Sequence, residues 1–377
     1  MNALSSLTEL PHIPFLDLQA EYRALAAEGL EQAILASLRR AFYIHGPAVH
    51  AFESHWAAYC HTTECVAMDS GTAALEIAMK GLGIGPGDEV IVPAHTFIAT
   101  AAAVVLCGAR PVFVDAEPGS WQIDPALIET AITPHTRAVI CVHLYGQPSN
   151  MAIIGEICTN RRLLLIEDAA QAQGATFEGR RVGAFGKVGC FSFYPAKNLG
   201  AFGDAGAITT SDAELAARMR RLCNHGRVTK YNHAEVGENL RMDELQGVVL
   251  DFKLPHLDGW NQRRRAIASL YRMRLAELPV FLPAAVAASE PVHHLFPIAT
   301  PRRDALLKFL AERNIDAGIH YPIPLHVQPA FRSLGYQRGD MPVAEWIGRE
   351  ELSLPIGPFM ADEQVHLVCD AVREFFR

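Results

Sequence analysis

Short apolar runs rich in β-branched residues alternate with helical segments between residues 89 and 167. The runs predict strands at 89–92, 111–114, 137–142 and 163–167. The intervening segments predict helices at 96–107, 125–132 and 151–159. Strands that alternate with helices pair in parallel, and the helices then cover both faces of the sheet. We therefore predict an α/β fold with a mostly parallel central sheet flanked by helices.

The segments on either side of this alternation predict the domain organisation. Apolar residues at helical spacing predict one helix from Asp17 to Arg40, and a second short helix follows Pro47. A long polar helix begins near Pro255. Beyond it, the expected elements are a strand and two helices, at 294–299, 304–313 and 362–376. We predict a large domain with an N-terminal helical segment over residues 1–254 and a smaller C-terminal α+β domain over residues 255–377.

Charge and cysteine content exclude several classes of function. The net charge of −8 argues against nucleic acid as a partner, because binding its phosphates needs a basic surface. The eight cysteines form no C-x-x-C pair, so we expect no metal site and reduced thiols in a cytoplasmic protein. Residues 1–15 lack the basic start of a signal peptide, and the apolar run 97–109 is too short to cross a membrane. We expect neither nucleic acid nor membrane as a partner.

The sheet itself indicates where chemistry should be sought. Ligands of parallel sheets bind outside the carboxyl ends of the strands. Polar residues follow the predicted strands there, at His95, Asp115, His143 and Asp168. Such a residue can simply cap a turn. Asp168, however, ends a strand of Leu and Ile, where a carboxylate is costly to bury without a cationic partner.

Lys197 stands in the most informative local segment, which reads Phe-Ser-Phe-Tyr-Pro-Ala-Lys-Asn-Leu-Gly from Phe191 to Gly200. The lysine follows a predicted strand on a turn that Pro195 sets, and glycines follow it. A lysine that acts as a nucleophile must reach a carbonyl and be shielded from water. A turn at the end of a strand, in the crevice of a sheet, meets both needs.

Two further segments favour a bound cofactor. Ser70, Gly71 and Thr72 open an apolar helix, and the start of a helix binds phosphate through free N–H groups. Plain capping of the helix by Ser70 is compatible with this interpretation. Phe97 follows the strand at 89–92 and could stack on a planar ring, although an isolated aromatic residue can equally belong to the core.

Taken together, these segments resemble the DegT/DnrJ/EryC1/StrS family of sugar aminotransferases, which are pyridoxal-phosphate enzymes of fold type I. The resemblance runs along most of the chain. Its further matching stretches are Pro14–Leu18, Gly85–Pro93, Gly237–Gln246 and Tyr321–His326. It implies pyridoxal 5'-phosphate as cofactor, with pyridoxamine 5'-phosphate as its intermediate form. The implied substrates are a nucleotide-linked keto sugar and an amino donor such as glutamate, in a ping-pong reaction.

The resemblance also implies roles for single residues. Lys197 matches the lysine that holds the cofactor as an aldimine, and Asp168 matches the partner of its ring nitrogen. The remaining cofactor positions are Gln171 near the 3-oxygen, Phe97 against the ring, and Gly71, Thr72 and Ser192 at the phosphate. Asn239 matches a residue that reaches the phosphate from the neighbouring subunit, which implies a homodimer with shared sites.

The residues that contact the substrate are predicted less directly. The diphosphate of a sugar nucleotide needs donors, and Arg and Lys pair well with phosphate oxygens. The candidates for substrate contacts are His95, His225, Arg227, Lys230, Tyr321 and His326. Each of the charged candidates could instead be an ordinary surface residue. The sugar, its nucleotide and the carbon that receives the amine stay open.

Three alternatives differ from this function. Some relatives are sugar dehydratases, but these carry His where this chain has Lys197. A non-catalytic regulator on the same fold would have no need of Lys197 or Asp168. A dehydrogenase or kinase is disfavoured because the glycines of Gly81–Gly87 do not have G-x-G-x-x-G spacing and precede a strand.

Overall fold

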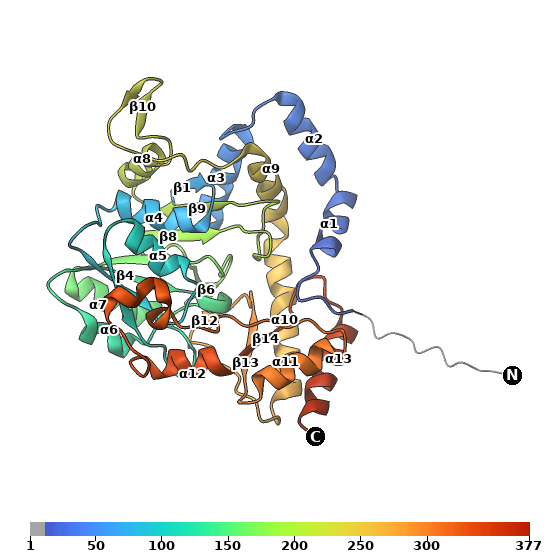
Figure 1. The fold of residues 1–377 in the computed structure, drawn as a ribbon. Coiled ribbons are helices and arrows are strands. Elements are labelled where there is room, and N and C mark those ends of the chain that lie inside the picture. The colour runs from blue at the N-terminus through green and yellow to red at the C-terminus, as the bar shows by residue number, and fades with distance from the viewer. Residues whose placement is uncertain (1–11) are drawn as a thin grey trace.

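The computed structural model describes residues 12–377, and its centre is a seven-stranded sheet in the order β1-β9-β8-β5-β4-β2-β3 (Figure 1). The strands are β1 (Glu64–Met68), β2 (Glu89–Pro93), β3 (Arg110–Val114), β4 (Thr136–Val142), β5 (Leu164–Asp168), β8 (Val188–Ser192) and β9 (Gly206–Thr210). β3, β2, β4, β5 and β8 pair in parallel, whereas β9 runs antiparallel to both β8 and β1. The predicted mostly parallel sheet is confirmed.

Helices cover both faces of this sheet because its strands are apolar on both sides. On one face, Val90 and Val92 of β2 pack in the cluster formed with α4 (Gly71–Gly81), α5 (Ala99–Leu106) and α8 (Ala213–Leu222). Ile91 points to the other face and packs with α6 (Pro125–Ala131) and α7 (Met151–Arg161). Successive strand residues point to opposite faces, so one run of Val and Ile supplies both cores.

The N-terminal helical segment differs from the prediction. The single helix expected from Asp17 to Arg40 is two helices, α1 (Leu18–Ala27) and α2 (Leu30–Arg40). Gly29 separates them with φ of 105°, a conformation that glycine adopts readily and that ends a helix. Apolar residues continue at helical spacing on both sides of Gly29, so the sequence pattern did not reveal the break between the two helices. The helix predicted after Pro47 is α3 (Pro47–Cys60).

The C-terminal part has its own small sheet and core. β13 (Phe296–Ala299) pairs antiparallel with β14 (Glu351–Leu354), a strand that the sequence pattern missed. The long α10 (Leu257–Leu275), α11 (Arg303–Ala311) and α13 (Asp362–Phe375) contribute to one apolar cluster beside this pair. Ile13 belongs to the same cluster, so the start of the described chain packs on its C-terminal part. The division near residue 255 stays a prediction.

Further elements complete the described fold. They are α9 (Glu244–Lys253), α12 (Pro342–Glu350), the small sheet of β6 (Thr176–Phe177), β7 (Arg180–Arg181) and β12 (Ser289–Glu290), the hairpin of β10 (Arg227–Thr229) and β11 (Asn232–His233), and short 3-10 helices at Leu144–Gly146, Leu254–His256, Leu325–Val327 and Pro329–Leu334. The β10–β11 hairpin projects from the body of the molecule (Figure 1).

Two expectations concern the whole chain. Within residues 12–377, no helix has the length and apolar character needed to cross a bilayer. All eight cysteines carry free thiols, and seven of them are buried. Residues 1–11, part of the stretch in which we expect no signal peptide, lie outside the described residues.

Candidate active site

A cavity of about 390 Å³ opens at the carboxyl ends of β2, β4, β5 and β8, and we call it the Lys197 cavity. Its position is the one expected for a parallel sheet. It brings together eight of the predicted site residues: Gly71, Thr72, Phe97, Asp168, Gln171, Ser192, Lys197 and Tyr321. They come from segments up to 250 residues apart, from Gly71 to Tyr321, so the fold assembles them.

Lys197 lies on a tight turn directly after β8. Its backbone N–H donates to the carbonyl oxygen of Tyr194 over 2.8 Å, and Ala201 N donates to Phe193 O over 2.8 Å. These bonds close the loop that Pro195 begins and hold the lysine at the cavity. Burial lowers the pKa of the Lys197 amine to about 8, and the nearby charge of Asp168 offsets this only in part. About a tenth of the amine is therefore neutral and nucleophilic at pH 7, far more than for an ordinary lysine.

Asp168 ends β5 and presents a buried carboxylate to the cavity. Its Oδ2 accepts a hydrogen bond from the Thr100 hydroxyl at 2.8 Å, and its Oδ1 accepts from Ala170 N at 3.2 Å. Burial raises the pKa of Asp168, although both hydrogen bonds and Lys197 oppose the shift. Among residues 12–377, no cation lies within ion-pair distance of this carboxylate. The site therefore fits a ligand that brings a positive charge.

The start of α4 forms an anion site against the end of β8. Ser70 caps the helix, since its Oγ accepts from Ala73 N at 3.2 Å, which realises the plain capping interpretation. A Cβ at Gly71 would come within 2.6 Å of Ser192 Cβ, so only glycine allows this approach. The first N–H groups of α4 and the Ser192 hydroxyl thus line the same wall of the cavity. This is a fitting cradle for a phosphate.

The opposite wall is an ordered polar and aromatic cluster. Gln171 Oε1 accepts from the backbone N–H of Tyr145 at 2.6 Å, and Gln171 Nε2 donates to the Tyr321 hydroxyl at 3.1 Å. The rings of Phe97 and Tyr321 are 5.4 Å apart. The Phe97 side chain is half exposed and faces the cavity instead of the core. The cavity therefore combines an amine, an unpaired carboxylate, a phosphate cradle and an aromatic wall, which fits pyridoxal phosphate.

Comparison with known proteins decides the family. The sequence profile of the DegT/DnrJ/EryC1/StrS aminotransferase family matches residues 26–373. The chain is 49% identical over 373 residues to the dTDP-3-amino-3,4,6-trideoxy-alpha-D-glucose transaminase of Streptomyces venezuelae, covering 99% of this chain and 98% of that one. The chain belongs to the DegT/DnrJ/EryC1/StrS aminotransferase family.

Two further relatives support this assignment. The dTDP-3-amino-3,6-dideoxy-alpha-D-galactopyranose transaminase of Aneurinibacillus thermoaerophilus is 44% identical over 363 residues, covering 96% of this chain and 99% of that one. The crystal structure of S. venezuelae DesV in complex with a ketimine intermediate superposes with a TM-score of 0.95 at 49% identity, covering 97% and 99% of the two chains. The predicted fold type I, the cofactor and nucleotide-sugar transamination are confirmed.

Two residues that we predicted to contact the substrate are buried behind the wall of the cavity. His95 is 2% exposed, and its Nε2 lies 2.7 Å from the Tyr145 hydroxyl. Burial lowers the pKa of His95 to about 4, so its ring is neutral. His326 is 1% exposed and its Nε2 lies 3.1 Å from Glu345 Oε1. Neither side chain lines the cavity, because both are buried against other side chains of the protein.

The other four predicted residues are exposed and outside the cavity. His225, Arg227 and Lys230 belong to the β10–β11 hairpin or the turn before it. Asn239 is exposed, and its Oδ1 accepts hydrogen bonds from Arg241. Within one chain the fold does not bring these residues to Lys197. Their assigned roles stay predictions that depend on a second subunit.

The cavity also contains residues that the motifs did not indicate. Thr100, which orients Asp168, is a lone polar residue in the apolar helix α5, and that contrast could have drawn attention to it. His320 precedes the predicted Tyr321, and Arg264 stands in the middle of the polar run of α10. Helical spacing could have distinguished Arg264 from its two arginine neighbours, since it falls on the same face of α10 as the apolar Leu257 and Tyr271.

One group of metal-binding side chains exists elsewhere in the described chain. Ligand atoms of His45, His50 and Glu53 lie within 4.8 Å of one another at the start of α3. Glu53 is already used, because its Oε1 accepts from Ala67 N at 2.8 Å and its Oε2 lies 3.2 Å from His50. The group lies outside the Lys197 cavity.

Proposed function

We propose that this enzyme transfers the amino group of an α-amino acid to C3 of a dTDP-linked 3-keto hexose. The names of both curated relatives, at 49% and 44% identity, specify a dTDP-3-amino sugar, and both align over nearly the whole chain. The observation that carries the catalytic part is the pair Lys197 and Asp168 in one cavity, a shielded amine and an unpaired carboxylate.

Bound pyridoxal phosphate supplies an aldehyde that condenses with amines and a ring that accepts electrons. Lys197 acts on it as nucleophile, because burial keeps part of its amine neutral. The neutral Lys197 amine would also be the base that moves the proton from the donor's α-carbon to the cofactor and, in the second half-reaction, moves a proton from the cofactor to C3 of the sugar. One amine in one cavity thus serves both half-reactions, which gives ping-pong kinetics.

Asp168 keeps a proton on the ring nitrogen of the cofactor. Its carboxylate is buried without a cation of its own, so a protonated ring nitrogen is the partner that relieves the cost of burial. Thr100 directs Oδ2 through a 2.8 Å hydrogen bond. Gly71, Thr72 and Ser192 would hold the phosphate, and Phe97 would lie against the ring face.

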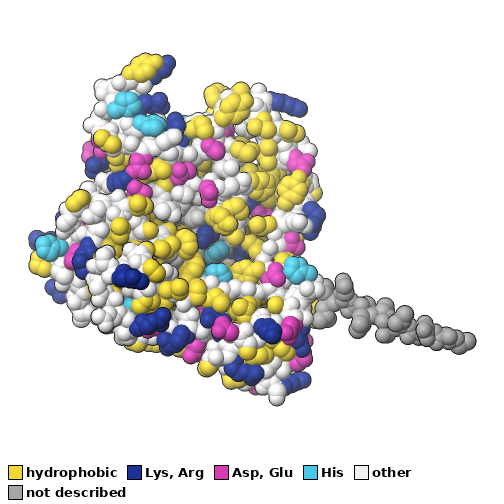
Figure 2. Space-filling view, in the orientation of Figure 1, with side chains coloured by type: hydrophobic (Ala, Val, Ile, Leu, Met, Phe, Trp, Pro, Cys, Tyr) yellow, Lys and Arg dark blue, Asp and Glu magenta, His cyan; other side chains and the backbone are white. Residues whose placement is uncertain are grey.

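The enzyme acts as a homodimer with shared sites in this proposal. Exposed hydrophobic side chains gather on α1, α2 and the segment after them: Leu18, Tyr22, Leu35, Leu38, Phe42, Tyr43 and Ile44. Hydrophobic side chains also surround the central hollow in Figure 2. A symmetric pair would cover such a surface. It would also bring Asn239 of a second copy toward the cofactor phosphate, and Arg227 and Lys230 toward the diphosphate of the sugar nucleotide.

Subunit mixing tests the shared site. Lys197→Ala and Asn239→Ala homodimers are each expected to be inactive or strongly impaired. A mixed dimer has one site with both defects and one site with neither, so activity should return to about a quarter of the unmixed wild type on random pairing. Light scattering establishes the mass of each species. A monomer in solution, or no recovery on mixing, contradicts the shared site.

Product analysis tests the reaction. The purified enzyme with pyridoxal phosphate, L-glutamate and a dTDP-linked 3-keto-6-deoxyhexose should form a 3-amino sugar nucleotide, identified by NMR, together with 2-oxoglutarate. Loss of a sugar hydroxyl without amine transfer would identify a dehydratase. Tight binding without turnover of any keto sugar would identify a regulator. Amination at another carbon would contradict the C3 assignment alone.

We also propose a cytoplasmic location, as the sequence led us to expect. Eight free thiols support it, because buried reduced cysteines persist in a reducing compartment.

A further inference from the structure

Arg264 is a buried guanidinium in the wall of the Lys197 cavity. It belongs to α10 and is 2% exposed, yet it lines the cavity together with Lys197. Burial lowers the pKa of Arg264 to about 10, which still leaves the side chain cationic at neutral pH. A buried cation is costly unless an anion compensates it.

The contacts of Arg264 account for only part of its hydrogen-bonding capacity. Nη1 donates to the carbonyl oxygens of His293 at 3.2 Å, His294 at 3.3 Å and Ile356 at 3.1 Å. The buried Nε has no hydrogen-bond partner. Within the part of the chain that the structure describes, no carboxylate forms an ion pair with Arg264. Glu21, whose charge acts on it, is already paired with Lys253.

The surroundings of Arg264 supply no other negative charge. His294 and His320 line the same part of the cavity, and burial lowers the pKa of both rings, to about 4 for His320, so both are neutral. Lys197 is the other basic group that acts on both histidines. The walls between them are apolar, with Phe15, Leu295 and Ile356. This end of the cavity thus holds uncompensated positive charge in a poorly solvated place.

We propose that Arg264 binds the carboxylate of the α-amino-acid donor. The proposal rests on the proposed function and adds the site that selects the donor. With Nη1 occupied by three carbonyls and Nε buried, Nη2 is the guanidinium nitrogen left to donate to a ligand, and its charged N–H groups suit a carboxylate oxygen. The same carboxylate would compensate the buried charge. It would also place the donor's amino group in the cavity that Lys197 shares, which is what exchange with the lysine requires.

Steady-state kinetics of Arg264→Gln, with Arg263→Gln as matched control, test this site. Arg263 precedes it on α10, is partly exposed and pairs with Asp362 at 2.7 Å, away from the cavity. In Arg264→Gln, KM for L-glutamate should rise about 30-fold or more, since a lost buried charge pair typically costs at least ~2 kcal/mol. KM for the keto sugar nucleotide should stay within about threefold. Arg263→Gln should match the wild type in both.

The opposite pattern overturns the proposal. A rise confined to the sugar nucleotide would mean that Arg264 binds the diphosphate. Equal rises in both KM values, with a lowered melting temperature, would mean that it only ties the three carbonyls together. Because Arg264→Gln also loses the hydrogen bonds to the three carbonyl oxygens, the kinetics of Arg264→Lys are measured as well. Lysine keeps the charge without the planar guanidinium that places Nη2, so its KM for L-glutamate should fall between those of the wild type and the Gln variant.

Two measurements do not depend on turnover of the sugar nucleotide, and the second of them needs no variant. Glutarate, a dicarboxylate without an amine, should bind the wild-type holoenzyme and Arg263→Gln in calorimetry but bind Arg264→Gln at least tenfold more weakly. On the unaltered enzyme, L-glutamate should convert the bound cofactor far faster than its α-carboxamide, as followed by absorbance. Equal rates and equal glutarate affinities refute the site. Glutarate binding that depends on Arg264, in a protein that aminates no keto sugar, would refute the proposed function alone.

Discussion

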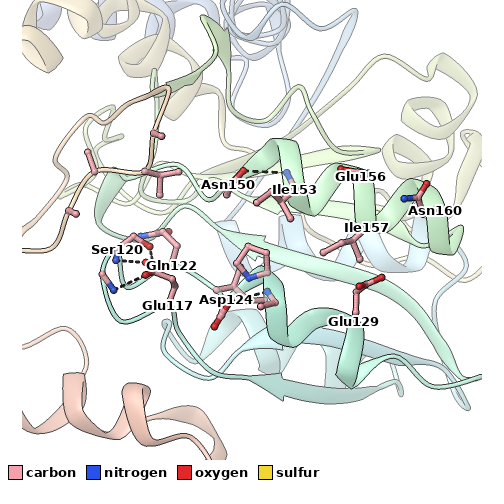
Figure 3. A pocket seen from close by; sticks show the side chains of 18 residues that line it. Glu117, Ser120, Gln122, Asp124, Glu129, Asn150, Ile153, Glu156, Ile157 and Asn160 are labelled. Atoms are coloured by element: carbon pink, nitrogen blue, oxygen red, sulfur yellow. Dashed lines mark hydrogen bonds between the residues drawn. The ribbon is translucent and has the colours of Figure 1, made fainter.

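Two hollows of the described chain make an instructive comparison, because the smaller one holds the chemistry. The Lys197 cavity measures about 390 Å³, whereas a groove of about 740 Å³ lies between α6, α7 and the loop at 284–287 (Figure 3). We call the second one the α6–α7 groove. It is rich in polar groups, including Glu117, Asp124, Glu129 and Asn150. Size and polarity therefore favour the groove as the more conspicuous site.

The two hollows differ in what their polar groups already do. In the groove, Asp124 and Asn150 cap α6 and α7, and Glu117 accepts from Gly119 N at 3.0 Å and folds a turn. Glu129 pairs with Arg161 at 3.0 Å. In the Lys197 cavity, Asp168 and Arg264 are buried with no ion-pair partner among residues 12–377, and Lys197 has a lowered pKa. A functional site is distinguished by charges that the protein itself leaves uncompensated.

Replacing Lys197 should have the largest effect. Lys197→Ala removes both the nucleophile and the base, so kcat should fall at least ~10⁴-fold. The absorbance of the lysine-bound cofactor should disappear, and borohydride should no longer fix the cofactor at this residue. Lys187→Ala is the matched control, since Lys187 is exposed, pairs with Asp212 and lies outside the cavity. Undiminished turnover by Lys197→Ala would reject the assignment of the site.

Neutralising Asp168 should come next. Asp168→Asn keeps the shape but removes the charge that holds a proton on the ring nitrogen, so kcat should fall about 10²- to 10³-fold. The equivalent change in the groove, Glu156→Gln, should leave kcat unchanged. Steady-state rates at saturating substrates compare the two. Equal losses in both variants would show that a general decrease in negative charge, and not the position at the end of β5, is responsible.

Removing the Thr100 hydroxyl should have an intermediate effect. Thr100→Val preserves the volume and deletes the 2.8 Å hydrogen bond to Asp168, which is worth about 1.5 kcal/mol and hence roughly tenfold in kcat. Thr159→Val on α7 is the control, because it deletes a bond of equal length to the Gly155 carbonyl beside the groove. Circular dichroism verifies that both variants fold. No rate difference between them would mean that Thr100 does not orient the carboxylate.

The pKa of Lys197 makes a prediction about pH in the cofactor-free protein. With a value of about 8, the neutral fraction should rise about tenfold from pH 7 to pH 9, whereas an ordinary amine with pKa ~10.4 remains mostly protonated. Acylation of Lys197, followed by peptide mass spectrometry, should therefore level off above pH 9. Between about 8 and ~10.4 the unfolded chain binds more protons, so the stability of the cofactor-free protein should rise with pH across this window. Acylation that still rises steeply at pH 10 would contradict the lowered value.

The sequence predicted the parts of the site that local patterns encode. Alternating runs gave the parallel sheet, and the residues at strand ends or helix starts, such as Asp168 and Gly71, could be placed on it from their spacing alone. Lys197 was identifiable because its turn follows a buried strand. These predictions succeeded since each depends on a few neighbouring residues and on one general property of parallel sheets.

The remainder depends on contacts between distant segments. Helical spacing places Arg264 on the buried face of α10, but it reaches the cavity because that face packs against the loops at 293–294 and 356, and spacing does not encode this packing. His95 and His326 were expected at the substrate, but their side chains bond to Tyr145 and Glu345 instead. Periodicity also could not locate the break at Gly29, because apolar residues continue at helical spacing on both sides of it.

Filling the α6–α7 groove should have the smallest effect of all. Ala285 is exposed in the loop that borders the groove, and Ala285→Trp would occupy much of its opening. Because Glu117, Asp124 and Glu129 of the groove already have partners within the protein, kcat and both KM values should change less than about twofold. A bulky residue in the smaller hollow, Ala170→Leu, should by contrast block substrate turnover. A changed KM in Ala285→Trp would show that the groove communicates with the Lys197 cavity, and uncompensated charge would then no longer suffice to separate a functional hollow from an inert one.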